Sequence, residues 1–182
     1  YSNMDERIVY TFYYYIDWWL WNAKNTMNTH KLIMLALVAS CAMLISAFVF
    51  QILGYPPCKI CIWQRWPHVL AILAGVLWLI KPDFRFIILG AFSTFLTSGL
   101  GLYHSGIEQK WWSGPSTCSS GKIDDLSVDE LFEKIMNAPL TRCDEIVWTF
   151  ANLSMANWNA ILSLLLTIVW IIAIKNKSIT SK

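Results

Sequence analysis

The sequence has few charged residues, and this scarcity excludes several classes of protein. Asp, Glu, Lys and Arg make up 14% of the 182 residues, and the hydrophobic fraction is 56%. The mean hydropathy of +0.45 is too high for an ordinary soluble domain. A net charge of +2 gives no basis for nucleic-acid binding. Five cysteines are too few for a disulfide-rich scaffold, and their odd number leaves at least one unpaired.

Four apolar runs dominate the chain and predict an all-α integral membrane protein built as a four-transmembrane-helix bundle. A helix of about 20 apolar residues crosses a hydrocarbon core of about 30 Å. Eleven Trp and seven Tyr suit the aromatic belts at the two membrane surfaces. The third run is rich in small residues, which let membrane helices approach closely. We expect helices over about 32–53, 62–80, 86–102 and 155–174, with loops over about 54–61 and 103–152.

The segment before the first run has no clear place in this bundle. Residues 8–21 are aromatic and apolar, but they are too few to span a membrane and Asp17 interrupts them. They suit the membrane interface, where Trp and Tyr are common. Alternatively Met27 begins the protein, so we expect an extension of uncertain status at 1–26 and a membrane domain at 27–182.

The cations predict how the bundle is oriented. Lys31, the Lys81 and Arg85 turn, and the C-terminal lysines all fall on one side of a four-span count. The positive-inside rule makes that side cytoplasmic, together with both termini. Loops 54–61 and 103–152 then lie outside, which in a bacterium is the periplasm, where disulfides persist.

The long outer loop is expected to carry a short amphipathic helix. Ser127 and Glu130 form a capping box, and apolar residues then recur at helical spacing until Pro139. Such a helix would lie on the membrane surface or pack against the loop itself.

The cysteines leave three kinds of site open. Cys41 lies within the first apolar run and is read as a buried apolar residue. The other four fall on the outer side and could be zinc ligands, structural disulfides or two communicating redox pairs. The wide spacing of Cys118 and Cys143 weakens the zinc interpretation. A disulfide between them would contribute about 3 kcal/mol by closing a loop.

Electrostatics favours redox chemistry at Cys58 and Cys61. Pro56 and Pro57 block a helix upstream, so the second helix should begin near the two cysteines. The positive end of a helix lowers the pKa of a nearby thiol. Arg65, four residues after Cys61, would share its face and stabilise a thiolate there. Alternatively, Arg65 reaches lipid headgroups.

These features resemble the DsbB family, bacterial inner-membrane quinone reductases that reoxidise the periplasmic dithiol oxidase DsbA. The resemblance rests on Pro-Cys-x-x-Cys-Ile-x-x-Arg at the head of the second helix, the four spans and the second outer cysteine pair. Cys-Ile-Trp-Gln-Arg-Trp-Pro-His and Gly-Leu-Tyr-His-Ser-Gly-Ile-Glu-Gln-Lys-Trp-Trp are similar to alphaproteobacterial members in particular. The resemblance extends from Met27 to the C-terminus, whereas residues 1–26 have no recognised counterpart in the family.

The resemblance implies a role for each outer cysteine. Cys118 would be attacked by a DsbA-like thioredoxin-fold oxidase, with Cys143 as its partner. Cys143 would then exchange with Cys58, and Cys61 would face ubiquinone or menaquinone from the membrane pool as a thiolate. Arg65 would stabilise that anion and polarise the quinone. The implied partners are thus the oxidase, the quinone pool and the bilayer, with no metal and no nucleic acid.

Two histidines near the outer surface are further candidates for the quinone site. His68 lies just inside the second run and His104 follows the third. Either could donate to a quinone oxygen or assist proton transfer, or simply cap a helix end. Two other functions stay open at this point. One is a relative that serves a single specialised partner, and the other is a non-enzymatic membrane protein with structural disulfides or zinc.

Overall fold

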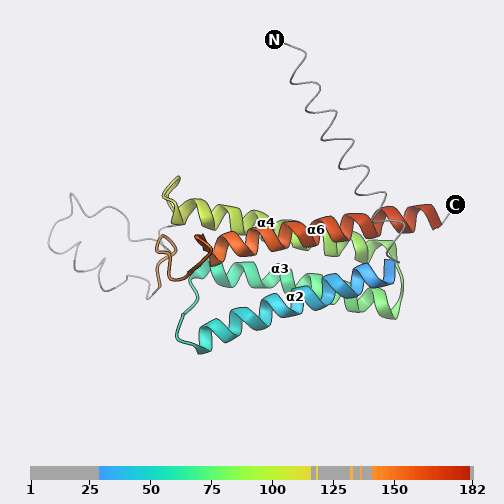
Figure 1. Cartoon of the computed structure of the whole chain (residues 1–182), viewed down its shortest axis with the longest axis horizontal. Helices are drawn as coiled ribbons and strands as arrows, with labels where there is room; N and C mark the ends of the chain where they lie inside the picture. Colours follow the sequence, from blue (N-terminus) through green and yellow to red (C-terminus); the bar gives the residue numbers. More distant parts are fainter. Residues whose placement is uncertain (1–28, 116–117, 119–131, 133–135, 137–140, 181–182) are drawn as a thin grey trace, which may run out of the picture.

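Four long helices lie side by side in the computed structural model and form an elongated bundle (Figure 1). The structure describes residues 29–115, 118, 132, 136 and 141–180, without the side chains of residues 177–180. The helices are α2 (Thr29–Ile52), α3 (Lys59–Ile80), α4 (Phe84–Glu108) and α6 (Met155–Thr180). A short antiparallel hairpin precedes α6 and consists of β1 (Thr149–Phe150) and β2 (Leu153–Ser154), with Thr149 opposite Ser154.

The four helices confirm the predicted membrane fold. Each is long and apolar enough to cross a bilayer, over Thr29–Ile52, Lys59–Ile80, Phe84–Glu108 and Met155–Asn176. Large apolar side chains such as Ile45, Phe92 and Leu165 are more than half exposed along the bundle. In water such a surface would drive aggregation, whereas in a bilayer it faces lipid chains.

The apolar core lies at the end of the bundle that holds the Lys81 turn. It combines Leu32, Ile33 and Ala36 of α2 with Trp78 of α3, Ile87 of α4, and Trp170 and Ala173 of α6. The opposite end, where α2 and α4 finish and α3 and α6 begin, is called here the cysteine end. Figure 1 shows α2 standing away from α6 toward the cysteine end.

Small residues allow α4 and α6 to pack closely, as the composition of the third run predicted. A Cβ added at Gly101 would lie 2.9 Å from the backbone nitrogen of Ala160. Ser98 Oγ donates a hydrogen bond to the carbonyl oxygen of the same Ala160, at 2.9 Å. Thr167 Oγ1 also donates to Thr94 Oγ1 at 3.1 Å. Close backbone approach and interhelical hydrogen bonds therefore hold α4 and α6 together.

Adding one methyl group at this contact is expected to destabilise the bundle. In Gly101→Ala the new Cβ meets backbone atoms that cannot rotate away, so unfolding should become easier by about 1–3 kcal/mol. Gly99→Ala is a matched control, because a Cβ there meets nothing within 4 Å. Thermal unfolding in detergent should show a lower midpoint for Gly101→Ala alone. Equal midpoints for the two variants would contradict the packing argument.

The helices at the cysteine end are longer than the hydropathy pattern predicted. α3 begins at Lys59 rather than near residue 62, so Cys61 lies within its first turn and not in a loop. α4 continues to Glu108 rather than ending near residue 102, which places His104 on a helix. Buried polar side chains cause the second difference, because they lower the hydropathy of a turn that is nevertheless packed inside the bundle. α2 and α6 run over Thr29–Ile52 and Met155–Thr180, in place of about 32–53 and 155–174.

Two further predictions fall largely on residues that the structure does not describe. The extension at 1–26 lies entirely outside the described residues. Of the expected amphipathic helix after Ser127, only Phe132 and Met136 are described, and both have helical backbone and exposed side chains.

Candidate redox site

Cys58 and Cys61 occupy the start of α3, where the chain turns from Pro57 into the helix. Cys58 is the N-cap residue, with extended backbone, and its sulfur accepts a hydrogen bond from the backbone N–H of Cys61 at 3.2 Å. The two sulfurs are free thiols that lie 2.7 Å apart. The N-cap geometry therefore folds the two cysteines toward each other, so a small movement can close a disulfide.

The helix start also favours a thiolate at Cys58. The hydrogen bond from the Cys61 thiol, helped by the backbone N–H groups of Cys61 and Ile60, lowers the pKa of Cys58. Burial of the sulfur and the nearby Glu108 carboxylate oppose this effect without reversing it. A backbone N–H group at the helix N-terminus thus donates to the Cys58 sulfur and favours a thiolate there. The sequence, by contrast, predicts the thiolate at Cys61.

Cys118 and Cys143 form a disulfide that lies against this helix start. Both are buried, and the backbone N–H of Cys143 donates to the carbonyl oxygen of Cys118 at 2.7 Å. Thr141 Oγ1 donates to the carbonyl oxygen of Pro57 at 3.2 Å, which ties the segment before Cys143 to the turn before Cys58. The second pair is thereby docked on the first.

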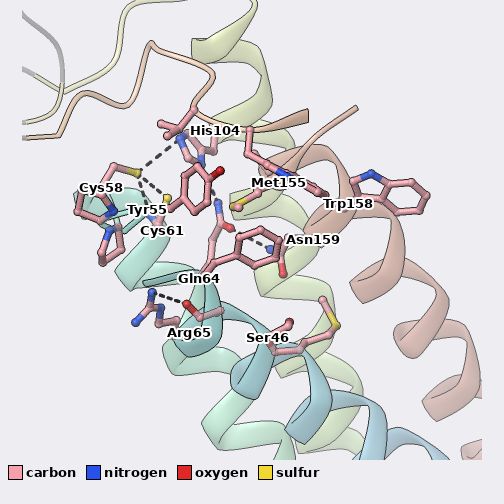
Figure 2. Close-up of a pocket in the computed structure, with 18 of the residues that line it drawn as sticks. Ser46, Tyr55, Cys58, Cys61, Gln64, Arg65, His104, Met155, Trp158 and Asn159 are labelled. Carbon is pink, nitrogen blue, oxygen red and sulfur yellow. Dashed lines mark hydrogen bonds between the residues drawn. The ribbon is translucent and has the colours of Figure 1, made fainter. Parts of the chain in front are cut away.

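The two pairs meet at a cluster of three buried groups. The sulfurs of Cys58 and Cys143 and a ring nitrogen of His104 all lie within 4.8 Å of one another. Figure 2 shows Cys58 at the start of α3 and His104 in the last turns of α4, and Cys143 belongs to the segment before β1. Because the sulfurs of the two pairs are this close, exchange between them requires only local side-chain motion.

A chain of hydrogen bonds fixes the ring of His104 beside Cys58. His104 Nε2 lies 3.6 Å from the Cys58 sulfur, and Gln64 Nε2 donates to His104 Nδ1 at 3.2 Å. Asn159 Nδ2 in turn donates to Gln64 Oε1 at 3.0 Å (Figure 2). Since Nδ1 accepts from Gln64, the neutral imidazole carries its proton on Nε2, where it faces the sulfur.

His68 lies at the far end of the same chain, deeper in the bundle. It is buried, and its Nε2 pairs with Asn159 Oδ1 at 3.1 Å. Its Nδ1 has no hydrogen-bond partner among the residues described. The structure therefore connects both predicted histidines through Asn159 and Gln64, but it places only His104 next to a sulfur.

Glu108 is a functional candidate that the sequence interpretation left without a role. Its carboxylate accepts a hydrogen bond from the Ser154 hydroxyl, and its other oxygen lies 3.9 Å from His104 Nε2. The i, i+4 spacing of His104 and Glu108 on one helix face was a signal for this pair. It was overlooked because the helix was expected to end near residue 102. Gln64 and Asn159 had no such signal, since they meet only in the folded bundle.

Arg65 contacts α2 rather than the sulfurs. Its Nη1 donates to Gln51 Oε1 at 3.0 Å, its Nη2 to the carbonyl oxygen of Ala47 at 3.5 Å, and its guanidinium lies 4.9 Å from the Phe48 ring centroid. Within the described ranges it forms no ion pair. Figure 2 shows Arg65 reaching from α3 toward its α2 acceptor. These bonds orient Arg65 from α2, and its predicted role toward a Cys61 thiolate stays a prediction.

A cavity of about 400 Å³ joins these groups to the lipid-facing side of the bundle. Its walls are the halves of α2 and α6 nearest the cysteine end, and it is called here the α2–α6 cavity. Apolar side chains such as Met43, Leu44 and Leu162 line it toward the membrane interior. Its polar end is formed by Cys58, Cys61, Gln64, Arg65 and His104. The cavity could hold a flat, largely apolar molecule with polar atoms at one end.

Comparison with known proteins agrees with this architecture. A family model described as disulfide bond formation protein DsbB matches residues 29–173. Disulfide bond formation protein B of Polaromonas sp. (strain JS666 / ATCC BAA-500) is 30% identical over 157 residues, which cover 82% of this chain and 92% of that protein. The same-named protein of Aeromonas hydrophila is also 30% identical, over 81% of this chain and 90% of its own.

An uncharacterized protein of Rickettsia prowazekii (strain Madrid E) is 26% identical, over 75% of this chain and 80% of its own. No solved structure gives a significant match to the chain. The family model covers most of the chain, including all four membrane helices except the end of α6. The protein therefore belongs to the DsbB family of membrane disulfide bond formation proteins.

Proposed function

We propose that this protein is a quinone reductase of the bacterial inner membrane that reoxidises a DsbA-like thioredoxin-fold dithiol oxidase. One observation carries the proposal. The Cys118–Cys143 disulfide is docked with its Cys143 sulfur within 4.8 Å of Cys58, which itself lies 2.7 Å from Cys61. Two cysteine pairs in series, with a cavity at the inner pair, are what an electron relay into the membrane requires.

The position of the cations in the bundle supports a periplasmic relay. The Lys81 turn and the C-terminal end of α6 lie at the end of the bundle opposite the cysteine end (Figure 1). Cations in short loops favour the cytoplasmic side, so both termini are cytoplasmic and the sulfurs are periplasmic. The outer pair can then meet a periplasmic oxidase.

The α2–α6 cavity fits a quinone. Its apolar walls suit an isoprenoid tail that leaves between α2 and α6 into lipid, and its polar end suits a ring with two carbonyl oxygens. Cys61 and Arg65 line the cavity on α3, and His104 lines it on α4. A bound ubiquinone or menaquinone would supply the chemistry that the chain lacks, by accepting two electrons and two protons.

Electrons reach the inner pair by a series of four thiol–disulfide exchanges. A thiolate of the partner attacks Cys118, the bond to Cys143 breaks, and Cys143 leaves as a thiolate. Cys143 then attacks Cys58 of the closed inner pair, and Cys61 leaves as a thiolate at the cavity. The second thiol of the partner releases the partner as a disulfide, and Cys118 displaces Cys58 to restore its bond to Cys143. One dithiol of the partner is thereby oxidised and the inner pair is reduced.

The remaining polar groups of the site would transfer protons and stabilise charges. When the Gln64 carboxamide turns so that its Oε1 accepts from Nδ1, His104 Nε2 is free to take a proton from the Cys58 thiol, 3.6 Å away, and hold it beside the cavity. The Glu108 carboxylate at 3.9 Å stabilises the imidazolium that results. Arg65, held by Gln51 on the cavity wall, supplies a fixed positive charge for an anion formed there.

The proposal is tested by measuring both substrates. Purified protein in detergent, kept free of oxygen, is mixed with a reduced thioredoxin-fold oxidase and a short-chain ubiquinone or menaquinone. We expect one quinone to be consumed for each partner dithiol oxidised, as followed by quinone absorbance and thiol titration. Quinone loss no faster than without the protein would overturn the proposal and leave the disulfide as a structural bond.

Glu108→Gln is expected to lower kcat for partner oxidation about 10-fold. Glutamine keeps a hydrogen-bond acceptor for Ser154 but removes the charge that stabilises protonated His104, so proton transfer slows. The KM for the partner should not change, because Glu108 is buried away from the surface. Asp83→Asn is the control, since Asp83 caps α4 at the opposite end of the bundle and does not line the cavity. Equal kcat values for the two variants would remove Glu108 from the mechanism.

A further inference from the structure

We propose that full reduction of the two cysteine pairs creates a Zn²⁺ site formed by Cys58, Cys61, Cys143 and His104. Metal bound there would hold the relay in its reduced state. The binding step stands on the geometry of these residues alone, whereas inhibition of turnover rests on the proposed function. The site is redox-gated, because it exists only when neither pair is closed as a disulfide.

Three of the four donor atoms, those of Cys58, Cys143 and His104, lie near the spacing of a tetrahedral zinc centre. Zn–S bonds of about 2.3 Å and Zn–N bonds of about 2.0–2.1 Å place neighbouring ligand atoms roughly 3.5–3.8 Å apart. Cys58 Sγ and His104 Nε2 are separated by 3.6 Å, and the Cys143 sulfur lies within 4.8 Å of both groups. The Cys61 sulfur, 2.7 Å from that of Cys58, needs to move away from it by about 1 Å and toward Cys143 and His104, which a change in its χ1 angle allows.

The oxidation state decides how many ligands are available. Cys143 is bonded to Cys118 in the structure, so its sulfur is occupied. Reduction of this bond frees the Cys143 thiol beside Cys58 and completes three sulfur ligands and one nitrogen. Zn²⁺ displaces the three thiol protons on binding, and it brings no electrons and takes none. The closed pairs of the oxidised protein offer only His104.

Gln64 can support the imidazole in the form that a metal requires. A histidine that binds metal through Nε2 must carry its proton on Nδ1 and donate it to an acceptor. The Gln64 amide nitrogen now faces Nδ1, at 3.2 Å. A half-turn of the carboxamide would bring Oε1 to the same place as that acceptor. Burial of Cys58, Cys143 and His104 excludes competing water, which favours a closed site with protein ligands only.

Metal binding is tested on the full-length protein in two oxidation states. Protein reduced with a phosphine and protein oxidised with quinone are titrated with Zn²⁺ against a chromophoric chelator. Co²⁺ serves as a second probe, since its visible bands report tetrahedral geometry and its near-ultraviolet bands report thiolate ligands. We expect one Zn²⁺ per reduced protein, none per oxidised protein, and tetrahedral Co²⁺ with thiolate bands.

Three variants assign the ligands. His104→Ala and Cys143→Ser should each weaken Zn²⁺ binding by about 100-fold, since loss of even an outer partner of a ligand costs about 10–100-fold. Cys41→Ser should bind as the wild type does, because Cys41 lies within α2 and does not line the cavity. Wild-type affinity in Cys143→Ser would overturn the proposal and reduce the site to a simple Cys58–Cys61 dithiol.

Turnover measurements separate this proposal from the proposed function. Stoichiometric Zn²⁺ added to the reduced protein should delay quinone-dependent oxidation until a chelator is added, whereas oxidised protein should begin turnover at once. If the protein binds Zn²⁺ as described but never oxidises a partner, the proposed function fails and the metal site stands. Equal Zn²⁺ binding by the reduced and oxidised forms would overturn the metal site, whatever the activity.

Discussion

Cys61→Ser is expected to abolish quinone-dependent oxidation of the partner, with a loss of at least about 10³-fold in kcat. Cys61 is the sulfur that leaves at the α2–α6 cavity, and without it the inner pair can neither form a disulfide nor pass electrons onward. A hydroxyl cannot replace it, because serine forms no disulfide and is far less acidic than a thiol. Quinone absorbance in the presence of the reduced partner measures the loss.

Cys41→Ser is the matched control for this loss. It makes the same substitution in the same membrane domain, on α2 and outside the cavity. We expect its turnover to equal that of the wild type, which would show that the loss in Cys61→Ser reflects chemistry rather than folding. If Cys61→Ser retained full activity, electrons would have to leave the protein without passing through the inner pair.

The sequence predicted the fold because its signals are local. A long apolar run predicts each membrane helix, and a proline among charged residues predicts the turn at Lys81. The Cys-x-x-Cys pair was placed at the right helix start for the same reason, since Pro56 and Pro57 precede it. Local patterns did not predict the end of α4, where the buried Glu108 accepts a hydrogen bond from Ser154 of another segment. Hydropathy counts such a residue as loop, although its carboxylate is hydrogen-bonded inside the fold.

The hydrogen bonds between the side chains of the site could not be predicted, because they join segments that are distant in the sequence. Spacing alone correctly placed Arg65 one turn after Cys61, yet the acceptor that orients it is Gln51, at the end of α2. Gln64 likewise meets Asn159, which is 95 positions away in the chain. A sequence identifies residues that can do chemistry, whereas the packing of α2, α4 and α6 around α3 decides which of them touch.

Cys143→Ser is expected to stop oxidation of the protein partner, while the Cys58–Cys61 pair still reacts with quinone. Oxidation of the protein partner should fall by at least about 10³-fold, because Cys118 then has no disulfide to offer. Quinone should still close the Cys58–Cys61 disulfide, since both sulfurs and the cavity remain. A small dithiol such as dithiothreitol, which can enter the cavity, should therefore continue to reduce quinone through this pair.

Thiol alkylation followed by mass spectrometry separates this outcome from misfolding. In Cys143→Ser incubated with quinone and the reduced partner, we expect Cys58 and Cys61 to stay protected as a disulfide while Cys118 is alkylated. Misfolded protein would instead expose all of its thiols. If the variant still oxidised the protein partner, the partner would have to reach Cys58 directly. Because the Cys58 side chain is only 4% exposed beneath Cys143, that result would require the loop to leave the helix start.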